Sequence, residues 1–197
     1  MKFFQLTVFA CIVFNLTVVA QSRWGITAGP NYASLHDKDN GQVPKLDPRV
    51  GFSVGGMYEW NSHENFGFQA ELAYTLAGGK GSKETTDLHY LMLPVSFTFS
   101  PVTWLKFGIG PQAGVLLGSN SDFDFRTFDA GAQAGVEFKL KDNVGIQVKN
   151  YFGLMYDKLE NMAAVPSDPL SPTEHDYRLN RNNVFQINLR YYFSSGK

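Results

Sequence analysis

Charged side chains recur at alternate positions of stretches that are otherwise apolar or small. This spacing places an ammonium or carboxylate group on one face of a strand, opposite an oily face. Where several such strands enclose a space, the charges either pair and fill it or line a narrow ion path. We favour the filled interior and keep the ion path as the alternative. The predicted polar network consists of Glu59, Glu71, Lys106, Asp129, Glu137, Lys149 and Arg190.

The residue types of a hydrolase are present, but their spacing assembles no catalytic site. The four histidines are His36, His63, His89 and His175. His89 begins a predicted strand and Ser82 precedes it, an arrangement that a lipid-modifying enzyme could place at the rim of a barrel. Nothing in the sequence fixes a nucleophile, a base and an orienting acid together. We predict that the protein is not an enzyme, and a lipid-modifying enzyme is the second alternative.

One segment has the opening spacing of a calcium loop. Asn120, Asp122 and Asp124 stand at alternate positions, as the first oxygen ligands of such a loop do. However, Phe125 occupies the position that needs glycine, and Gly131 occupies the position that needs glutamate. We therefore predict no metal site and no cofactor.

The elements that must position the charged residues are eight stretches of alternating character. In residues 50–60, for example, large apolar residues alternate with small or polar ones. A period of two over ten residues predicts a strand with one oily face and one small or polar face. The predicted strands cover about residues 23–35, 50–60, 66–77, 88–99, 105–117, 127–139, 144–154 and 184–193.

The connections between these stretches alternate in length. Those after the second, fourth and sixth strands are short, and the others are longer, with residues 155–182 the longest. The glycine-rich run over residues 78–84 is predicted to be a loop. Three prolines, Pro30, Pro94 and Pro111, fall inside strands. Because proline cannot donate to a ladder, we predict a bulge or a frayed end at each of them.

The first 20 residues have the pattern of an export signal. Lys2 precedes a mainly apolar stretch over residues 3–19. We predict a cleaved signal peptide over residues 1–20 and a single domain over residues 21–197. A retained membrane helix is disfavoured because the stretch is short and contains polar residues. Cys11, the only cysteine, could anchor a lipid, but the bulky Phe9 disfavours that alternative.

Alternation leaves open which face of the predicted barrel points outward. A soluble, lipocalin-like barrel also has eight strands, with its oily face around an internal ligand. Aromatic residues at the strand ends and glycines on the other face favour a membrane barrel. The predicted fold is all-β: an eight-stranded antiparallel up-and-down transmembrane β-barrel, OmpA/OmpX-like, in the outer membrane of a Gram-negative bacterium. Its short turns would face the periplasm and its longer loops the outside.

Several segments resemble the PorT-type outer-membrane β-barrel family. In chain order, they are ELAYT (71–75), YLMLP (90–94), GIGP (108–111) and the pair DAG and GVE (within 129–137). Residues 149–154 stand where the family often has Arg-Tyr-x-x-Gly-Leu, and Lys149 and Asn150 depart from that pattern. The resemblance implies the fold and the outer-membrane address. The family's named member serves a protein-secretion apparatus, but most members have no assigned role, so the resemblance implies no specific function.

The longest connection, residues 155–182, is the candidate surface for a protein partner. It mixes aromatic and aliphatic residues with prolines and a charged run. Barrels hold such loops at a fixed base, and loops often carry function, although an ordinary solvated loop is the alternative. The candidate contact residues are Tyr156, Leu159, Met162 and Tyr177.

These features predict a non-enzymatic outer-membrane barrel with a structural or interaction role through its extracellular loops. An accessory role in protein secretion is one form of this prediction, and a narrow pore or transport barrel is the first alternative. The expected partners are outer-membrane lipids and lipopolysaccharide, the barrel assembly machinery, and an extracellular or secretion-system protein. Nucleic acid is not expected, because the net charge is −1 and no basic patch occurs.

Overall fold

The alternating stretches form strands because each strand can turn one face outward and the other into a shared interior. The computed structural model describes residues 21–36, 47–62, 64–80, 85–120, 127–155, 157–159, 177–179 and 181–193. The predicted signal peptide, residues 1–20, lies outside this part of the chain. Among the described residues, no helix has the length and apolar character needed to cross a bilayer.

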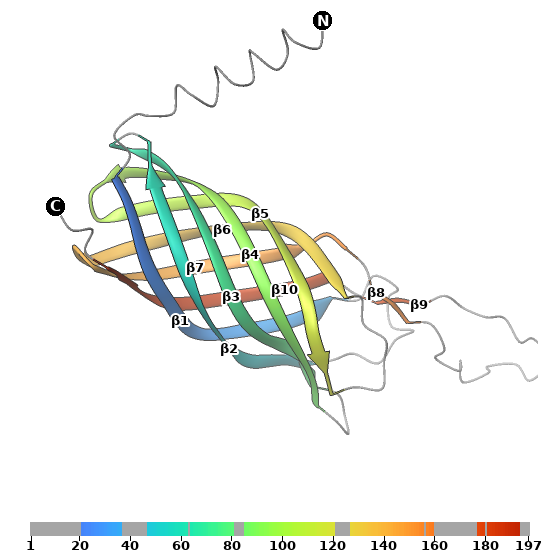
Figure 1. The fold of residues 1–197 in the computed structure, drawn as a ribbon. Coiled ribbons are helices and arrows are strands. Elements are labelled where there is room, and N and C mark those ends of the chain that lie inside the picture. The colour runs from blue at the N-terminus through green and yellow to red at the C-terminus, as the bar shows by residue number, and fades with distance from the viewer. Residues whose placement is uncertain are drawn as a thin grey trace, which may run out of the picture.

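Eight antiparallel strands close into one barrel (Figure 1), in the order β1-β10-β7-β6-β5-β4-β3-β2. The prediction of an eight-stranded antiparallel up-and-down barrel is therefore confirmed. The barrel strands are β1 (Gln21–His36), β2 (Asp47–Asn61), β3 (Phe66–Lys80), β4 (Thr85–Val102), β5 (Leu105–Ser119), β6 (Phe128–Lys141), β7 (Val144–Gly153) and β10 (Arg181–Tyr192).

The two ends of the barrel differ. At one end, here the turn end, β1 begins, β10 ends and short turns join β2 to β3, β4 to β5 and β6 to β7. The opposite end, here the loop end, carries the longer connections (Figure 1). Outward aromatic pairs gather near the turn end, with ring centroids 4.7 Å apart for Trp24 and Tyr58 and 5.0 Å apart for Phe66 and Phe99. Such clusters are typical of a membrane-interface girdle.

The glycine-rich run does not begin as a loop. β3 continues through Gly78 and Gly79 to Lys80, which pairs with Thr85, so the prediction of a loop from residue 78 onward is wrong. Gly78 has a φ of 138°, and a Cβ there would lie 2.0 Å from the Thr86 carbonyl oxygen. Glycine permits both the backbone angle and the close approach, so it extends the strand at this point.

The predicted bulges at the prolines are also wrong. Ala28 opposes Leu189 and Asn31 opposes Gln186, so the register is the same on both sides of Pro30. Likewise, the register between β4 and β5 does not shift at Pro94, and that between β5 and β6 does not shift at Pro111. At each proline the ladder opens locally without slipping: Pro30 has no partner in β10, Pro94 has none in β3 and Pro111 has none in β4.

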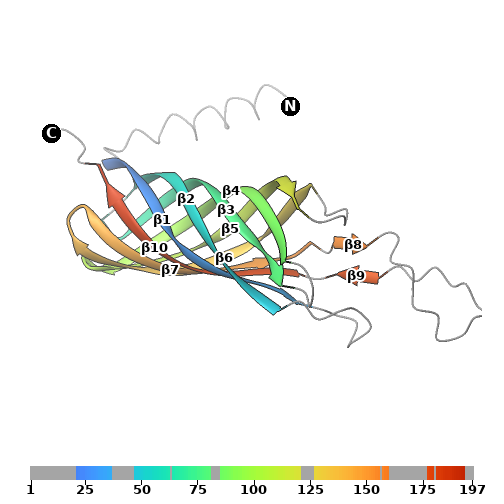
Figure 2. The same cartoon turned by 90° about the horizontal axis from the view of Figure 1, so that it is seen from below.

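A short hairpin interrupts the longest connection. β8 (Asp157–Leu159) pairs with β9 (Tyr177–Leu179), and both lie beyond the loop end of the barrel (Figure 2). β10 also begins at Arg181, within the predicted loop. The prediction of loop throughout residues 155–182 is wrong at these places, because neither three-residue strand is long enough to show a period.

Candidate functional site

Inward side chains fill the barrel with a continuous series of ion pairs near the turn end. The series runs through Arg23, Glu59, Lys106, Glu137, Arg190, Glu71 and Lys149, and we call it the charge chain. Cations and carboxylates alternate along it. The side chains come from β1, β2, β3, β5, β6, β7 and β10, so closure of the barrel is what brings them together.

The centre of the charge chain is fully enclosed. Arg190 is 1 % exposed and donates to Glu137 at 3.0 Å and to Glu71 at 3.1 Å. Lys106 donates to Glu59 and lies 3.8 Å from Glu137. Charges held in so little water interact strongly, but each also costs several kcal/mol to remove from water. The arrangement is therefore stable only as long as each buried charge keeps its partners.

The two ends of the charge chain have different surroundings. Arg23 lies at the turn end with 20 % of its side chain exposed, and it donates to Glu59 at 2.7 Å. Lys149 lies deeper, 5 % exposed, and donates to Glu71 at 2.9 Å. The cation at the outer end can reach water, whereas the cation at the inner end is buried.

Two neutral residues complete the charge chain. The Tyr192 hydroxyl donates to Glu137, at 2.7 Å and 2.8 Å from its two oxygens, and the Arg23 guanidinium lies 4.5 Å from the centre of the tyrosine ring. Gln69 accepts a hydrogen bond from Arg190 at 2.9 Å. The predicted network did not include Tyr192 or Gln69, although both stand on the polar face of their strands. Their place in the alternation of inward and outward residues is the signal that could have identified them.

Six of the seven residues of the predicted network lie in the charge chain, and Asp129 does not. It is buried at the start of β6, at the loop end, where Asn182 lies 3.5 Å from its carboxylate. Alternation placed Asp129 on the correct face, but it does not encode height along the barrel axis. Height depends on the register between strands.

Toward the loop end, buried apolar side chains gather inside the barrel, beside buried polar residues such as Asp129 and Asn182. This cluster, here the apolar layer, takes its side chains from β1, β3, β4, β5, β7 and β10. Its members are Ala33, Ala77, Leu88, Tyr90, Met92, Tyr151 and Val184, with Leu116 packed against them. The barrel interior is thus filled at two levels along its axis, by apolar packing toward the loop end and by ion pairs nearer the turn end.

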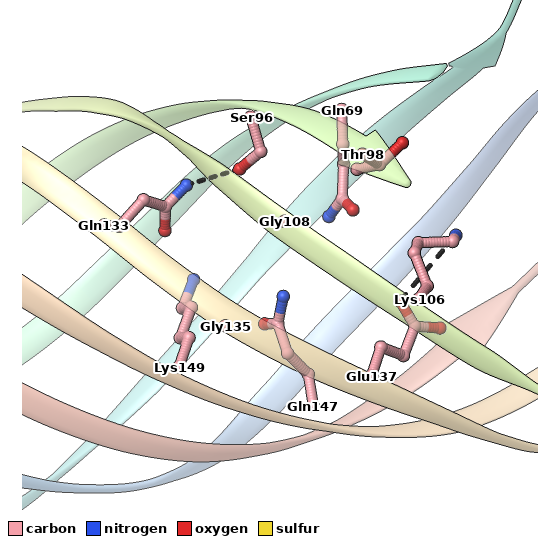
Figure 3. Close-up of a pocket in the computed structure, with 10 residues that line it drawn as sticks. All are labelled: Gln69, Ser96, Thr98, Lys106, Gly108, Gln133, Gly135, Glu137, Gln147 and Lys149. Atoms are coloured by element: carbon pink, nitrogen blue, oxygen red, sulfur yellow. Dashed lines mark hydrogen bonds and ion pairs between the residues drawn. The ribbon is translucent and has the colours of Figure 1, made fainter. Parts of the chain in front are cut away.

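A small cavity lies beside the charge chain (Figure 3). Its volume is about 10 Å³, which is close to the least that holds one water molecule. In Figure 3, Gln69 points toward Gln147 and Lys149 across this space. Lys106 and Glu137 also line the cavity, and so does Gly108.

Of the candidate catalytic residues, the structure describes the side chain of His89 alone. His89 stands on the outward face of β4, where its Nδ1 lies within hydrogen-bond distance of the Tyr74 hydroxyl. Ser82, His63 and His175 lie outside the described residues, and nothing is described of the His36 side chain. Among the residues that the structure covers, no three side chains that could hold a metal ion gather in one place.

The candidate partner residues fall in the longest connection. Leu159 opposes Tyr177 in the β8–β9 hairpin. Tyr156 and Met162 lie outside the described residues, as do Asp122 and Asp124 of the segment that resembles a calcium loop. Asn120 is described: its side chain accepts a hydrogen bond from the Asp87 amide at 2.7 Å and donates to the Thr85 carbonyl at 3.0 Å. These hydrogen bonds tie the end of β5 to the start of β4.

Solved structures of outer-membrane proteins share this fold. OprG from Pseudomonas aeruginosa has 11 % identity and a TM-score of 0.54, with 89 % of this chain and 98 % of that chain covered. Neisserial surface protein A has 15 % identity and a TM-score of 0.53, with 86 % and 97 % covered. AlkL, determined in lipid bilayers, has 13 % identity and a TM-score of 0.50, with 90 % and 92 % covered. At such identities the likeness shows the fold alone.

The sequence itself identifies the family. None of the curated proteins matches the chain. The profile of the outer membrane protein β-barrel domain family, however, matches residues 19–156, which is more than half of the chain. With its closed eight-stranded barrel and its resemblance to solved outer-membrane barrels, this chain belongs to the outer membrane protein β-barrel domain family.

Proposed function

We propose that the protein is a non-enzymatic outer-membrane barrel that acts as a scaffold or interaction partner through its extracellular loops and conducts no ions. The observation that carries this proposal is that buried side chains fill the interior at two levels. An ion crossing the barrel would have to displace both the charge chain and the apolar layer. An eight-stranded barrel has an interior just wide enough for side chains, which leaves no second route.

With the interior filled, the loops are the part of the protein that can bind a partner. In the proposed orientation, the turn end faces the periplasm and the loop end faces outside the cell. The β8–β9 hairpin then extends from the loop end, away from the membrane (Figure 2). A paired hairpin presents a more fixed surface than an open loop does. The partner would be an extracellular or secretion-system protein, and the PorT-like segments are consistent with the second.

The proposed outer-membrane location requires export and assembly of the barrel. A signal peptide over residues 1–20 would be removed, and β1 begins at Gln21, directly after that site. The barrel assembly machinery of a Gram-negative cell would then insert the domain, with lipids and lipopolysaccharide around its outward face. Large apolar side chains on the outward face suit that environment. Ile109, for example, is 63 % exposed.

Planar-bilayer recording tests the closed interior. The reconstituted protein should give no steady conductance, and neither should Ile109→Val, a lipid-facing control. Regular channel steps whose selectivity changes in Lys106→Glu would show that the charge chain lines a path, and the pore interpretation would replace this proposal. For the partner, a protein captured equally well by the wild type and by a variant without residues 157–179 would move the interaction away from the hairpin.

A further inference from the structure

We propose that the cavity beside the charge chain binds one ordered water molecule, which accepts a hydrogen bond from the Lys149 ammonium group and donates one to the Gln147 side chain. This water is then part of the folded barrel and links the inner end of the charge chain to Gln147. The proposal concerns only the interior of the barrel and does not depend on the function of the loops. It rests on the size of the cavity, on its lining and on one buried acceptor.

The size and the lining of the cavity suit a single water molecule. The volume is about 10 Å³, which is enough for one water and excludes larger ligands. Eight of the ten lining residues carry polar side chains, and the other two are glycines, Gly108 and Gly135. Cavities that stay empty in proteins are apolar, whereas buried water occupies sites where polar groups converge. The lining therefore favours an occupied cavity.

A buried acceptor on the wall of this cavity requires a donor. The Gln147 carbonyl oxygen is buried and has no hydrogen-bond partner among the described residues. An acceptor left in that state loses its hydration and gains nothing in return. Gln147 and Lys149 stand at successive inward positions of β7, and in Figure 3 both extend toward Gln69 on the opposite side of the cavity. A water molecule between them supplies the missing donor.

Lys149 supplies the hydrogen bond that the water accepts. Its ammonium group has donors left after the hydrogen bond of 2.9 Å to Glu71. Because Lys149 is only 5 % exposed, these donors need partners inside the barrel. Gln133 also lines the cavity; its side-chain nitrogen donates to Ser96 at 2.7 Å, and its carbonyl oxygen can accept the second proton of the water. The water then has one donor and two acceptors around it, as is typical of buried water.

The surroundings disfavour an ion in the same place. A sodium ion would meet two lining ammonium groups, those of Lys106 and Lys149, and like charges repel strongly in so little water. A halide ion is too large for the cavity, and it has no proton to donate to the Gln147 oxygen. Water is neutral and both donates and accepts, so it satisfies the acceptor and the ammonium group together.

Gly108 allows the water to be displaced without changing a charge. A Cβ at this position would meet only ordinary contacts, at 3.7 Å from Ser96 Cβ and 3.9 Å from Ser96 Oγ and Thr98 Cγ2. Gly108→Ala therefore places a methyl group in the cavity and strains nothing nearby. It leaves the Gln147 oxygen without a donor. Gln147→Met is the companion variant, because it keeps a side chain of similar length and removes the acceptor.

The experiment is a double-mutant cycle of these two substitutions, measured by thermal unfolding in detergent micelles. Gly108→Ala should lower the midpoint by about 2–8 °C more in the wild type than in the Gln147→Met variant, because only the wild type has an acceptor that loses its partner. The effect of the methyl group on the backbone is common to both backgrounds and cancels. An equal change in the two backgrounds would overturn the proposal.

Crystal structures of the wild type and of Gly108→Ala give a second readout that does not depend on stability. Density for one water molecule within hydrogen-bond distance of Lys149 Nζ and Gln147 Oε1 should be present in the wild type and absent from the variant. An empty cavity in the wild type would contradict the proposal, and so would a direct hydrogen bond from Lys149 to Gln147 in place of the water.

Discussion

The apolar layer and the charge chain fill the barrel interior by different means. Near the loop end, the apolar layer is held by packing of uncharged side chains such as Leu88 and Val184. Near the turn end, the charge chain is held by pairing of buried ions such as Arg190 and Glu71. Truncating an apolar side chain removes only its own packing, whereas neutralising a carboxylate of the chain leaves cations buried without a partner. The apolar layer should therefore tolerate substitutions that conserve side-chain volume, whereas the charge chain should tolerate only substitutions that conserve charge.

The largest expected effect follows from removing the carboxylate that serves the inner end of the charge chain. Glu71→Gln leaves Lys149 with no carboxylate partner and Arg190 with only Glu137. We expect a decrease of about 3–5 kcal/mol in the free energy of unfolding. Urea unfolding in detergent micelles, followed by gel mobility without boiling, measures it.

Glu137→Gln is the matched comparison for that prediction. Lys106 and Arg190 would each keep a second carboxylate, Glu59 and Glu71. The decrease in stability should therefore be smaller than that of Glu71→Gln. Equal decreases in the two variants would mean that the number of remaining partners does not govern the stability of the charge chain.

A smaller effect is expected from truncation in the apolar layer. Leu88 is 1 % exposed within it, and Leu88→Ala should cost about 2–5 kcal/mol, since it removes buried methyl groups and leaves a cavity. Leu88→Met should cost less than about 1.5 kcal/mol because it nearly conserves the volume. The same urea titration gives both values. If Leu88→Met destabilised as much as Leu88→Ala, shape rather than volume would govern the layer.

The smallest effect is expected at the exposed end of the charge chain. Arg23→Gln removes a cation whose side chain is 20 % exposed, and its partner Glu59 keeps Lys106. A decrease in stability of about 1 kcal/mol is expected, from a screened ion pair and the stacking of Arg23 on the Tyr192 ring. The decrease should shrink as salt is added, because this end reaches water. A decrease as large as that of Glu71→Gln would show that both ends of the chain are equally buried.

Particular residues show how far the sequence could be interpreted. Parity along each strand predicted that Glu59 and Lys106 share the interior, and the structure pairs them. The same alternation placed Asp129 with them, yet Asp129 lies at the loop end. Alternation shows on which face of a strand a residue lies, but not its position along the barrel axis. The β8–β9 hairpin escaped prediction because strands of three residues show no period. The signal peptide and the partner residues of the longest connection remain predictions.

The sequence by itself determined the strands and their two faces, because a period of two separates an oily face from a polar one on every strand. Aromatic residues at the strand ends then favoured a membrane barrel over a soluble one. Only the tertiary structure decided which charges meet. Glu71 and Lys149 are separated by 78 residues, and their pairing depends on the register of every strand between β3 and β7. Register is set by pairing across strands, so a local pattern cannot specify it. The ion pair of Lys149 with Glu71, and the cavity beside it, exist only once the barrel has closed.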